Sequence, residues 1–148
     1  MRIFVDANII IATLNREYPL FNWSARVLSL NGRQNIRLFT SPLCLAIAFY
    51  FASKKSGETA AKKKIELLCS NIGISAIDQE ITEKAVRNQK INDFEDGLQY
   101  YSALGQECDI IVTEDQHDFY FSEIEVLGCE ALLKRLSAEK NRDTPLYT

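Results

Sequence analysis

The chain has 148 residues, of which 47% are hydrophobic and 10% aromatic, enough for one domain around a single sizeable core. Seventeen Lys and Arg against twenty Asp and Glu give a formal net charge of −3. This excludes an overall positive field, so a polyanion has to be met by a local patch. The apolar stretches are shorter than the roughly 18 residues that span a bilayer and the start lacks a signal-peptide pattern, so we predict a cytoplasmic protein with no membrane contact.

Strand patterns alternate with helical patterns in the first half of the chain. Residues 2–10 resemble a short buried strand that ends in polar residues, and residues 20–31 have a helical spacing that stops before Gly32. Residues 36–41 are the second predicted strand. The pair Ser41 and Pro42 predicts a helix start over 42–55, and a further helix follows over 58–71.

The same alternation continues to the end of the chain. The patterns predict a strand at 74–78, a helix at 79–89, a helix capped by Asp93 at 94–107, strands at 109–115 and 124–128, and a helix at 129–140. We predict one domain over 1–136 and a C-terminal tail over 137–148. Cys44, Cys69, Cys108 and Cys129 form no CxxC pair, and we expect them to be reduced and mostly buried.

Strands separated by helices imply crossover connections, and hence a mainly parallel sheet of about five strands between two helical layers. Ligands of such sheets bind beyond the carboxyl ends of the strands. Carboxylates gather there: Asp6 follows the first strand, Asp115 and Asp118 follow the fourth, and Asp93 and Asp96 open the helix before it. Carboxylates this close repel one another unless a cation relieves them, so we predict bound Mg²⁺ or Mn²⁺.

A structural interpretation stays open for each acid by itself. Asp93 is a good N-cap, and Glu95 and Asp96 lie in a first helical turn that favours acids. The joint placement of Asp6, Asp96, Asp115 and Asp118 favours the metal site.

Two stretches resemble the PIN domain family. "FVDANII" is similar to the family's opening strand, and "DFEDGLQYYSALGQECDIIVTEDQHDF" to its second half, within a match over roughly residues 1–136. The resemblance implies a three-layer α/β/α fold, a Mg²⁺ or Mn²⁺ site and metal-dependent cleavage of RNA; many bacterial members are toxins controlled by an antitoxin. By position, the resemblance implies metal ligation by Asp6, Asp96 and Asp115, a catalytic Asp118 beside them, and support from Asn8, Thr113 and Asp93.

One position departs from the family's pattern. The helix over 42–55 matches the segment that usually carries a Glu facing the metal, but Ile47 stands at that place and "PLCLAIAFYFAS" contains no acid. A pocket with one carboxylate fewer binds a divalent ion more weakly. We therefore keep two hypotheses: a metal-dependent endoribonuclease with a toxin role, and a catalytically weak or inactive PIN-like protein that binds RNA or a protein partner.

Two other α/β families with an Asp at a strand end fit the sequence less well. Dehalogenase-type phosphatases need a DxD after the first strand, which "DAN" does not supply, and the acidic pair of receiver domains is absent.

Phosphate contacts are predicted for Lys54, Lys55, Lys62, Lys63 and Lys64, with a solvated helix end as the equal alternative. Tyr100 and Tyr101 are candidates for base stacking, and Phe21 and Trp23 for an antitoxin or homodimer surface, with core roles as the alternative. We expect His117 to be an exposed loop residue.

Overall fold

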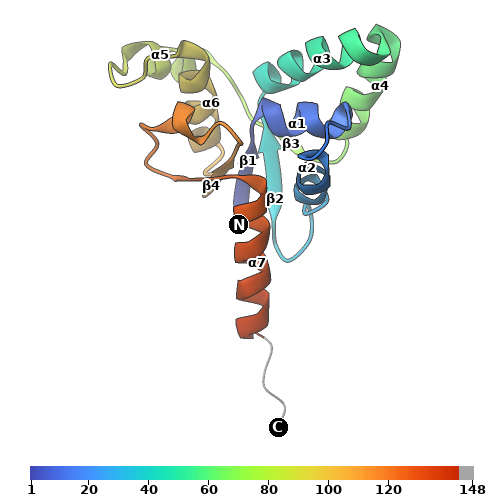
Figure 1. The fold of residues 1–148 in the computed structure, drawn as a ribbon. Coiled ribbons are helices and arrows are strands. Elements are labelled where there is room, and N and C mark those ends of the chain that lie inside the picture. The colour runs from blue at the N-terminus through green and yellow to red at the C-terminus, as the bar shows by residue number, and fades with distance from the viewer. Residues whose placement is uncertain (144–148) are drawn as a thin grey trace.

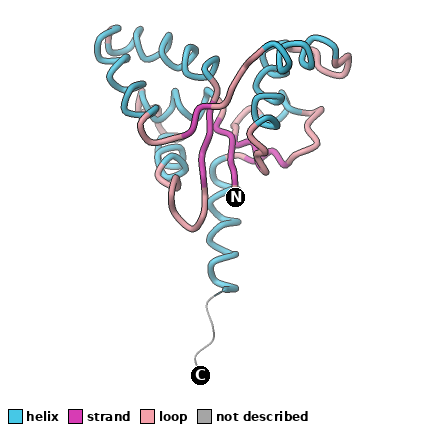
Figure 2. The backbone as a smooth tube through the Cα atoms, turned by 180° about the vertical axis from the view of Figure 1, so that it is seen from behind, coloured by secondary structure: helices cyan, strands magenta, loops and turns pink. Residues whose placement is uncertain are grey.

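A computed structural model describes residues 1–143, and a sheet of five parallel strands lies at its centre (Figures 1 and 2). The strands are β1 (Arg2–Val5), β2 (Arg37–Thr40), β3 (Gly73–Ile74), β4 (Ile110–Val112) and β5 (Glu125–Leu127). They are ordered β3-β2-β1-β4-β5, and every neighbouring pair is parallel. The predicted α/β fold with a five-stranded parallel sheet is confirmed.

The helices lie on both sides of the sheet (Figure 1). One group contains α1 (Ala7–Leu14), α2 (Phe21–Leu28), α3 (Pro42–Ser56) and α4 (Glu58–Cys69). The other contains α5 (Gln79–Arg87) and α6 (Phe94–Gly105). The last helix, α7 (Cys129–Asp143), packs on α2 and extends away from the carboxyl ends of the strands. The carboxyl ends of the strands therefore point toward the side of the molecule on which α3 and α5 lie (Figure 1).

The two central strands are apolar along their whole buried length. Ile3, Phe4 and Val5 of β1 are fully buried, and they pair in register with the equally buried residues 110–112 of β4. A continuous hydrophobic run is typical of a parallel strand that is covered on both faces. Because β1 and β4 are neighbours, the residues that follow them meet at one edge of the sheet.

The first predicted strand was too long. It ends at Val5, and Ala7–Leu14 form α1 instead of continuing the strand. Asp6 is the N-cap of this helix, with an extended backbone and a carboxylate that accepts the Ala7 N–H at 2.8 Å. The β-branched run from Ile9 to Ile11 favours a strand locally. Burial of Ile9 and Ile10 in the core stabilises the helix despite that propensity.

Two other boundaries differ from the predictions. The strand predicted at 74–78 is reduced to Gly73–Ile74, and α7 continues to Asp143 rather than ending at residue 140. The predicted tail over 137–148 is therefore helical up to Asp143, and its remaining residues, 144–148, lie outside the described part of the chain. The division of the chain at residue 136 stays a prediction.

The described residues contain no candidate membrane span and no disulfide. No helix within residues 1–143 is both long and apolar enough to cross a bilayer. All four cysteines are free; Cys44, Cys108 and Cys129 are buried, whereas Cys69 is exposed at the end of α4. The prediction of reduced, mostly buried thiols is therefore confirmed, with Cys69 as the exposed one.

The contact between Gly73 and Phe39 gives a stability test of the short edge strand. A Cβ atom at residue 73 would lie 2.5 Å from Cδ1 of the buried Phe39 ring, so we expect Gly73→Ala to destabilise the protein by about 1–3 kcal/mol. Gly105→Ala is the control, because its Cβ would lie 3.5 Å from Ile81 Cδ1. Urea unfolding measures both; equal stabilities would contradict this packing.

Candidate metal centre at the carboxyl ends of the strands

Asp6 is the acid most firmly held by the sheet. It follows β1, and its backbone N–H donates to Val112 O at 3.1 Å. Its Oδ1 accepts from the Ala7 N–H and its Oδ2 accepts from Thr113 Oγ1 at 2.9 Å. Burial raises the pKa of Asp6; the bonds from Thr113 and Ala7 oppose that rise, and the charge of Asp115 adds to it. Asp6 is thus a fixed, partly buried carboxylate that is costly to ionise.

Asn8 links the ends of β1 and β4. Its Nδ2 donates to Thr113 Oγ1 at 2.9 Å, to Asp115 Oδ2 at 3.0 Å and, more weakly, to Asp6 Oδ2 at 3.4 Å. Its Oδ1 accepts from the Glu114 N–H at 3.3 Å. The amide therefore lies between two carboxylates and neutralises neither, so it fixes their positions while their repulsion remains.

Asp96 lies in the first turn of α6, which belongs to the other helical group from α1. Burial, followed by the charges of Asp93, Asp118, Asp6 and Glu95, raises the pKa of this carboxyl to about 7. Such a shift means that the folded protein resists placing another negative charge here. The carboxylates from three separate segments therefore act on one another electrostatically.

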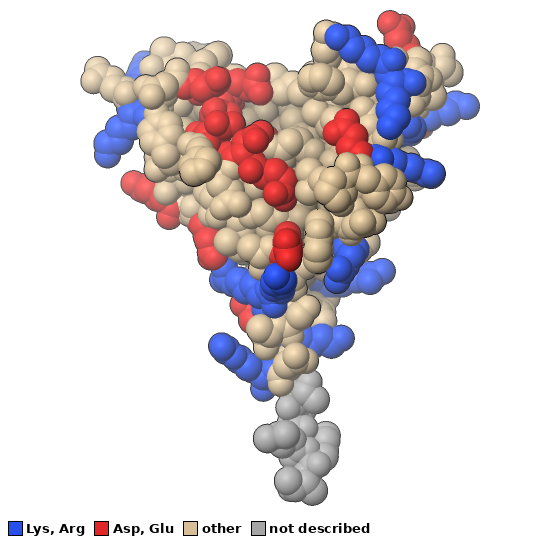
Figure 3. Space-filling view, viewed as in Figure 1, with Lys and Arg blue, Asp and Glu red and all other residues tan. Residues whose placement is uncertain are grey.

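The remaining predicted acids are Asp93 at the start of α6 and Asp118 in the segment after β4. Asp93 caps α6, and its Oδ1 accepts from the Glu95 N–H at 2.9 Å. Asp118 lies in the short 3-10 helix η1 (Gln116–Phe119), where its N–H donates to Asp115 O at 3.0 Å. Burial, followed by the charges of Asp93 and Asp6, raises the pKa of Glu95. Figure 3 shows acidic side chains in a band that runs from one upper lobe to the centre of this face.

The carboxylates at this edge have the right chemistry to bind a hard divalent cation, but they do not surround a single point where the cation would lie. Carboxylate oxygens are the ligands that Mg²⁺ and Mn²⁺ prefer, and mutual repulsion of this kind is relieved by a cation. Within residues 1–143, however, no group of three Asp, Glu, His or Cys side chains is arranged to hold a metal ion as it stands.

The N-terminus of α3 forms the floor beside Asp6. Ser41 caps the helix, accepting from the Cys44 N–H at 3.0 Å, and its hydroxyl donates to Gln99 Oε1 of α6. The buried Cys44 thiol donates to Asp6 Oδ1 at 3.8 Å. Ile47 lies one turn further along α3, partly buried and packed against the core. The side chain of α3 that contacts Asp6 is thus a thiol, whose pKa is raised to about 12 by burial and then by the charge of Asp6.

The predicted lysine cluster divides into two groups. Lys55 donates to Asn15 O and Lys64 donates to Leu14 O at 3.0 Å, so both cap the carbonyl end of α1. The Lys54 ammonium lies 4.2 Å from the centre of the Tyr50 ring. Lys62 and Lys63 are exposed on α4. Structural contacts therefore engage Lys55 and Lys64, a role that the sequence pattern did not indicate.

The predicted aromatic and histidine residues have mixed environments. Tyr100 is buried and its hydroxyl accepts from the Glu123 N–H at 3.2 Å, so it is a core residue rather than a free stacking surface. Tyr101 and Trp23 are partly buried against the core, and Phe21 packs on Tyr18 with ring centres 5.2 Å apart. His117 is exposed, as expected.

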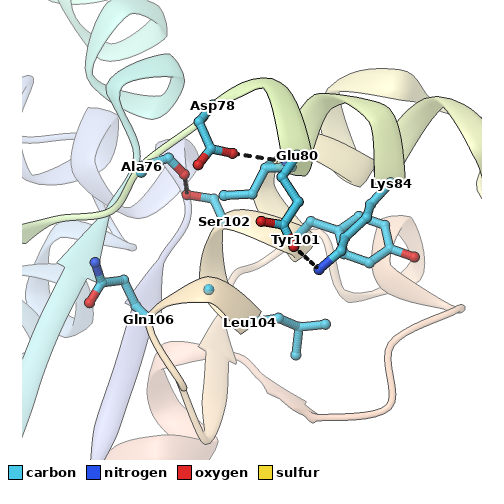
Figure 4. A pocket seen from close by; sticks show the side chains of 10 residues that line it. Ala76, Asp78, Glu80, Lys84, Tyr101, Ser102, Leu104 and Gln106 are labelled. Carbon is cyan, nitrogen blue, oxygen red and sulfur yellow. Dashed lines mark hydrogen bonds and ion pairs between the residues drawn. The ribbon is translucent and has the colours of Figure 1, made fainter.

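A cavity of about 530 Å³ lies apart from the acids, between α5 and α6. Figure 4 shows Asp78, Glu80, Lys84 and Ser102 around it. Glu80 and Lys84 form an ion pair at 3.0 Å, and Asp78 caps α5 by accepting the Ile81 N–H at 2.9 Å. The charged groups that line this cavity thus already have partners within the protein.

Comparisons with known proteins agree with this architecture. The model of a family described as PIN domain matches residues 2–117. A curated relative, Ribonuclease VapC1 of Aquifex aeolicus (strain VF5), is 26% identical over 138 residues, which cover 90% of this chain and 94% of that protein.

Solved structures share the fold at lower identity. VapBC-1 from nontypeable Haemophilus influenzae superposes with a TM-score of 0.68 at 18% identity, covering 88% of this chain and 99% of that one. VapBC2 from Rickettsia felis, bound to a promoter DNA fragment, superposes with a TM-score of 0.65 at 17% identity, covering 86% and 98%.

The raised pKa of Asp96 predicts a pH-dependent stability. Between its ordinary value of 3.8 and about 7 the folded state holds a proton that the unfolded state has lost, so stability falls as pH rises through this window. We expect Asp96→Asn, which cannot ionise, to show a shallower fall in melting temperature from pH 4 to pH 8. Parallel curves for the two proteins would contradict the assignment.

Proposed function

The chain belongs to the PIN domain family, and from that premise we propose that it is a metal-dependent endoribonuclease and the toxin of a toxin–antitoxin pair. The observation that carries this proposal is the placement of Asp6 and Asp115 around Asn8, opposite an Asp96 whose pKa is raised by neighbouring acids. A set of mutually repelling oxygen donors at the carboxyl edge of a parallel sheet suits a divalent cation and a phosphodiester substrate.

The relatives support both parts of the proposal. The Aquifex aeolicus relative is named a ribonuclease and matches nearly the whole chain. VapC20 of Mycobacterium tuberculosis, described as a toxin that cleaves the sarcin-ricin loop, shares the fold with a TM-score of 0.60 at 16% identity. From these proteins we extend an RNA substrate and a toxin role to this chain. We further propose a cytoplasmic location, an antitoxin protein as partner and assembly as a homodimer.

In this proposal each residue of the edge has a defined task. Asp6, Asp96 and Asp115 would hold Mg²⁺ or Mn²⁺, and Asp118 would lie beside them. When bound, the cation supplies a more acidic water and neutralises charge on the scissile phosphate. Asn8 and Thr113 keep the Asp6 and Asp115 carboxylates in place through their hydrogen bonds. No protein nucleophile is needed, which agrees with buried, high-pKa thiols at Cys44 and Cys129.

A second candidate function is binding of RNA or a protein partner with little or no cleavage. It is favoured by α3, which has an isoleucine at residue 47 where the family's pattern usually has a Glu. Cys44, one turn before it, contacts Asp6 through a neutral thiol. The centre then has one anionic donor fewer, and its remaining acids are not arranged around one point. The two candidates differ in metal affinity, which the following experiments measure.

Metal binding should depend on Asp6. We expect Mn²⁺ to bind the native chain with roughly millimolar affinity, because one acid is missing, and to bind Asp6→Asn at least about tenfold more weakly. Titration calorimetry at pH 8 measures both. Asp143→Asn, an equal charge change at the end of α7, is the control and should bind like the native chain. Equal binding by all three proteins would refute the site.

Restoring an acid at residue 47 should strengthen the centre. We expect Ile47→Glu to bind Mn²⁺ more tightly and to cleave single-stranded RNA faster, because an added anionic ligand helps to hold the cation. Without a cation, the partly buried Glu should lower the melting temperature, since an unpaired charge in an apolar site costs several kcal/mol.

Ile47→Gln is the matched control, because a glutamine side chain has nearly the same shape as glutamate but carries no charge. RNA cleavage and thermal melting are measured for both variants with and without Mn²⁺. If Ile47→Glu melts lower and gains neither metal stabilisation nor cleavage relative to Ile47→Gln, residue 47 is ordinary core.

A further inference from the structure

A pocket of about 440 Å³ lies at the carbonyl end of α1, between α1, α3 and α4. Three cationic side chains line it, those of Arg16, Lys55 and Lys64, and no carboxylate does. In a chain with a net charge of −3, such a cavity is a local positive site. Its chemistry suits an anion with several oxygen acceptors.

Two of the cations are held in place by the protein itself. Lys55 donates to Asn15 O, and Lys64 donates to Leu14 O at 3.0 Å and to Ser56 Oγ at 3.3 Å. These carbonyls end α1, where the helix dipole favours positive charge. An ammonium group has three donors, so each lysine retains at least one donor for a ligand. Because the side chains are already ordered, binding costs them little additional entropy.

The third cation stands at a position that normally favours glycine. Arg16 directly follows the C-cap residue Asn15, and its φ is +50°. Residues with a Cβ atom adopt this left-handed conformation at a cost, and Gly or Asn is the usual choice after a helix. Local strain of this kind is a reason to look for a function. Here the strained residue, Arg16, is exposed and lines the pocket.

The pocket and the acidic centre lie at opposite ends of the same helix. Asp6 caps the start of α1 and Asn15 caps its end, so the two sites are separated by about 13 Å at 1.5 Å per residue. Figure 3 shows basic side chains on one upper lobe and the acidic band on the same face. In a stacked strand with 3.4 Å per nucleotide, this separation corresponds to about four nucleotides, and to fewer in an extended strand.

We propose that the Arg16–Lys55–Lys64 pocket binds a backbone phosphate of the RNA a few nucleotides away from the bond that is cut at the acidic centre. The inference rests on the proposed ribonuclease function and adds a specific anchor to it. It separates Arg16, Lys55 and Lys64 from Lys62 and Lys63, which are exposed on α4 and do not line the pocket. The anchor holds the strand across an acidic centre that by itself repels phosphate.

The test uses Arg16, because substituting either lysine also removes a cap from α1. Fluorescence anisotropy with a labelled single-stranded RNA and a chelator measures binding without cleavage. We expect Arg16→Gln to weaken binding about three- to tenfold at low salt and to reduce the salt slope by about 0.7. Arg16→Lys should bind nearly as the native chain does.

Two further variants separate binding from folding. Arg16→Gly suits the left-handed backbone, so it should melt at or above the native temperature and yet bind RNA as weakly as Arg16→Gln. Arg33→Gln is the matched control, an equal charge change at an exposed position before β2. We expect it to bind normally, and we expect the double change Lys62→Gln and Lys63→Gln to have the smaller effect per charge.

The outcomes distinguish this inference from the proposed function. Equal weakening by every basic substitution would indicate a diffuse field and overturn the anchor. Mn²⁺-dependent cleavage by the native chain with unchanged KM and affinity in Arg16→Gln would overturn the anchor alone. A native chain that neither binds nor cleaves RNA overturns both. Arg16-dependent binding of an acidic peptide, without RNA binding, would assign the pocket to a protein partner and also overturn the anchor.

Discussion

Asp6 places a carboxylate at the point where the central strand passes into α1, and the carboxyl edge of the sheet is organised around that charge. The group cannot simply be buried, because desolvation raises its pKa and Asp115 raises it further. It is held by donors from its own helix and from Thr113, which follows the neighbouring strand. Asn8 extends the same network to Asp115. The pairing of β1 with β4 is therefore also what brings these carboxylates together.

The second acidic segment is positioned by contacts outside the sheet. Tyr120, just after η1, donates its hydroxyl to Lys90 O and accepts from the Asn92 N–H at 3.1 Å. This joins the turn that carries Asp118 to the loop that leads into α6. Asp96 and Asp118 can then act on each other, as the raised pKa of Asp96 indicates. The elements α6 and η1 are thus in contact with each other, and the charge of Asp6 acts on Asp96.

A centre built in this way has a cost and a use. Like charges at one edge destabilise the folded protein unless they are protonated or matched by a cation, which is why such clusters are more often functional than structural. On the α3 side the buried Cys44 thiol contacts Asp6 without adding a negative charge, and the apolar Ile47 adds none either.

The sequence by itself determined the alternation of strands and helices, the parallel sheet, and the capping of α3 by Ser41 and of α6 by Asp93. These features depend on hydrophobic period and on hydrogen bonds between residues a few positions apart, which a local pattern records. It also placed Asp6 and Asp115 at strand ends. Only the tertiary structure decided that Ala7–Leu14 are helical, because burial of Ile9 and Ile10 outweighs their strand propensity.

The remaining features depend on contacts between distant parts of the chain. Asn8 and Thr113 are 105 residues apart, and Lys64 and Leu14 are 50 apart. A lysine of the predicted cluster either caps α1 or faces solvent, depending on where α1 ends relative to α3 and α4. The spacing of residues along the sequence does not encode this relative position. The pKa of Asp96 likewise depends on charges from three segments. Long-range packing decides which distant residues and charges lie close together, so these features could be obtained only from the folded chain.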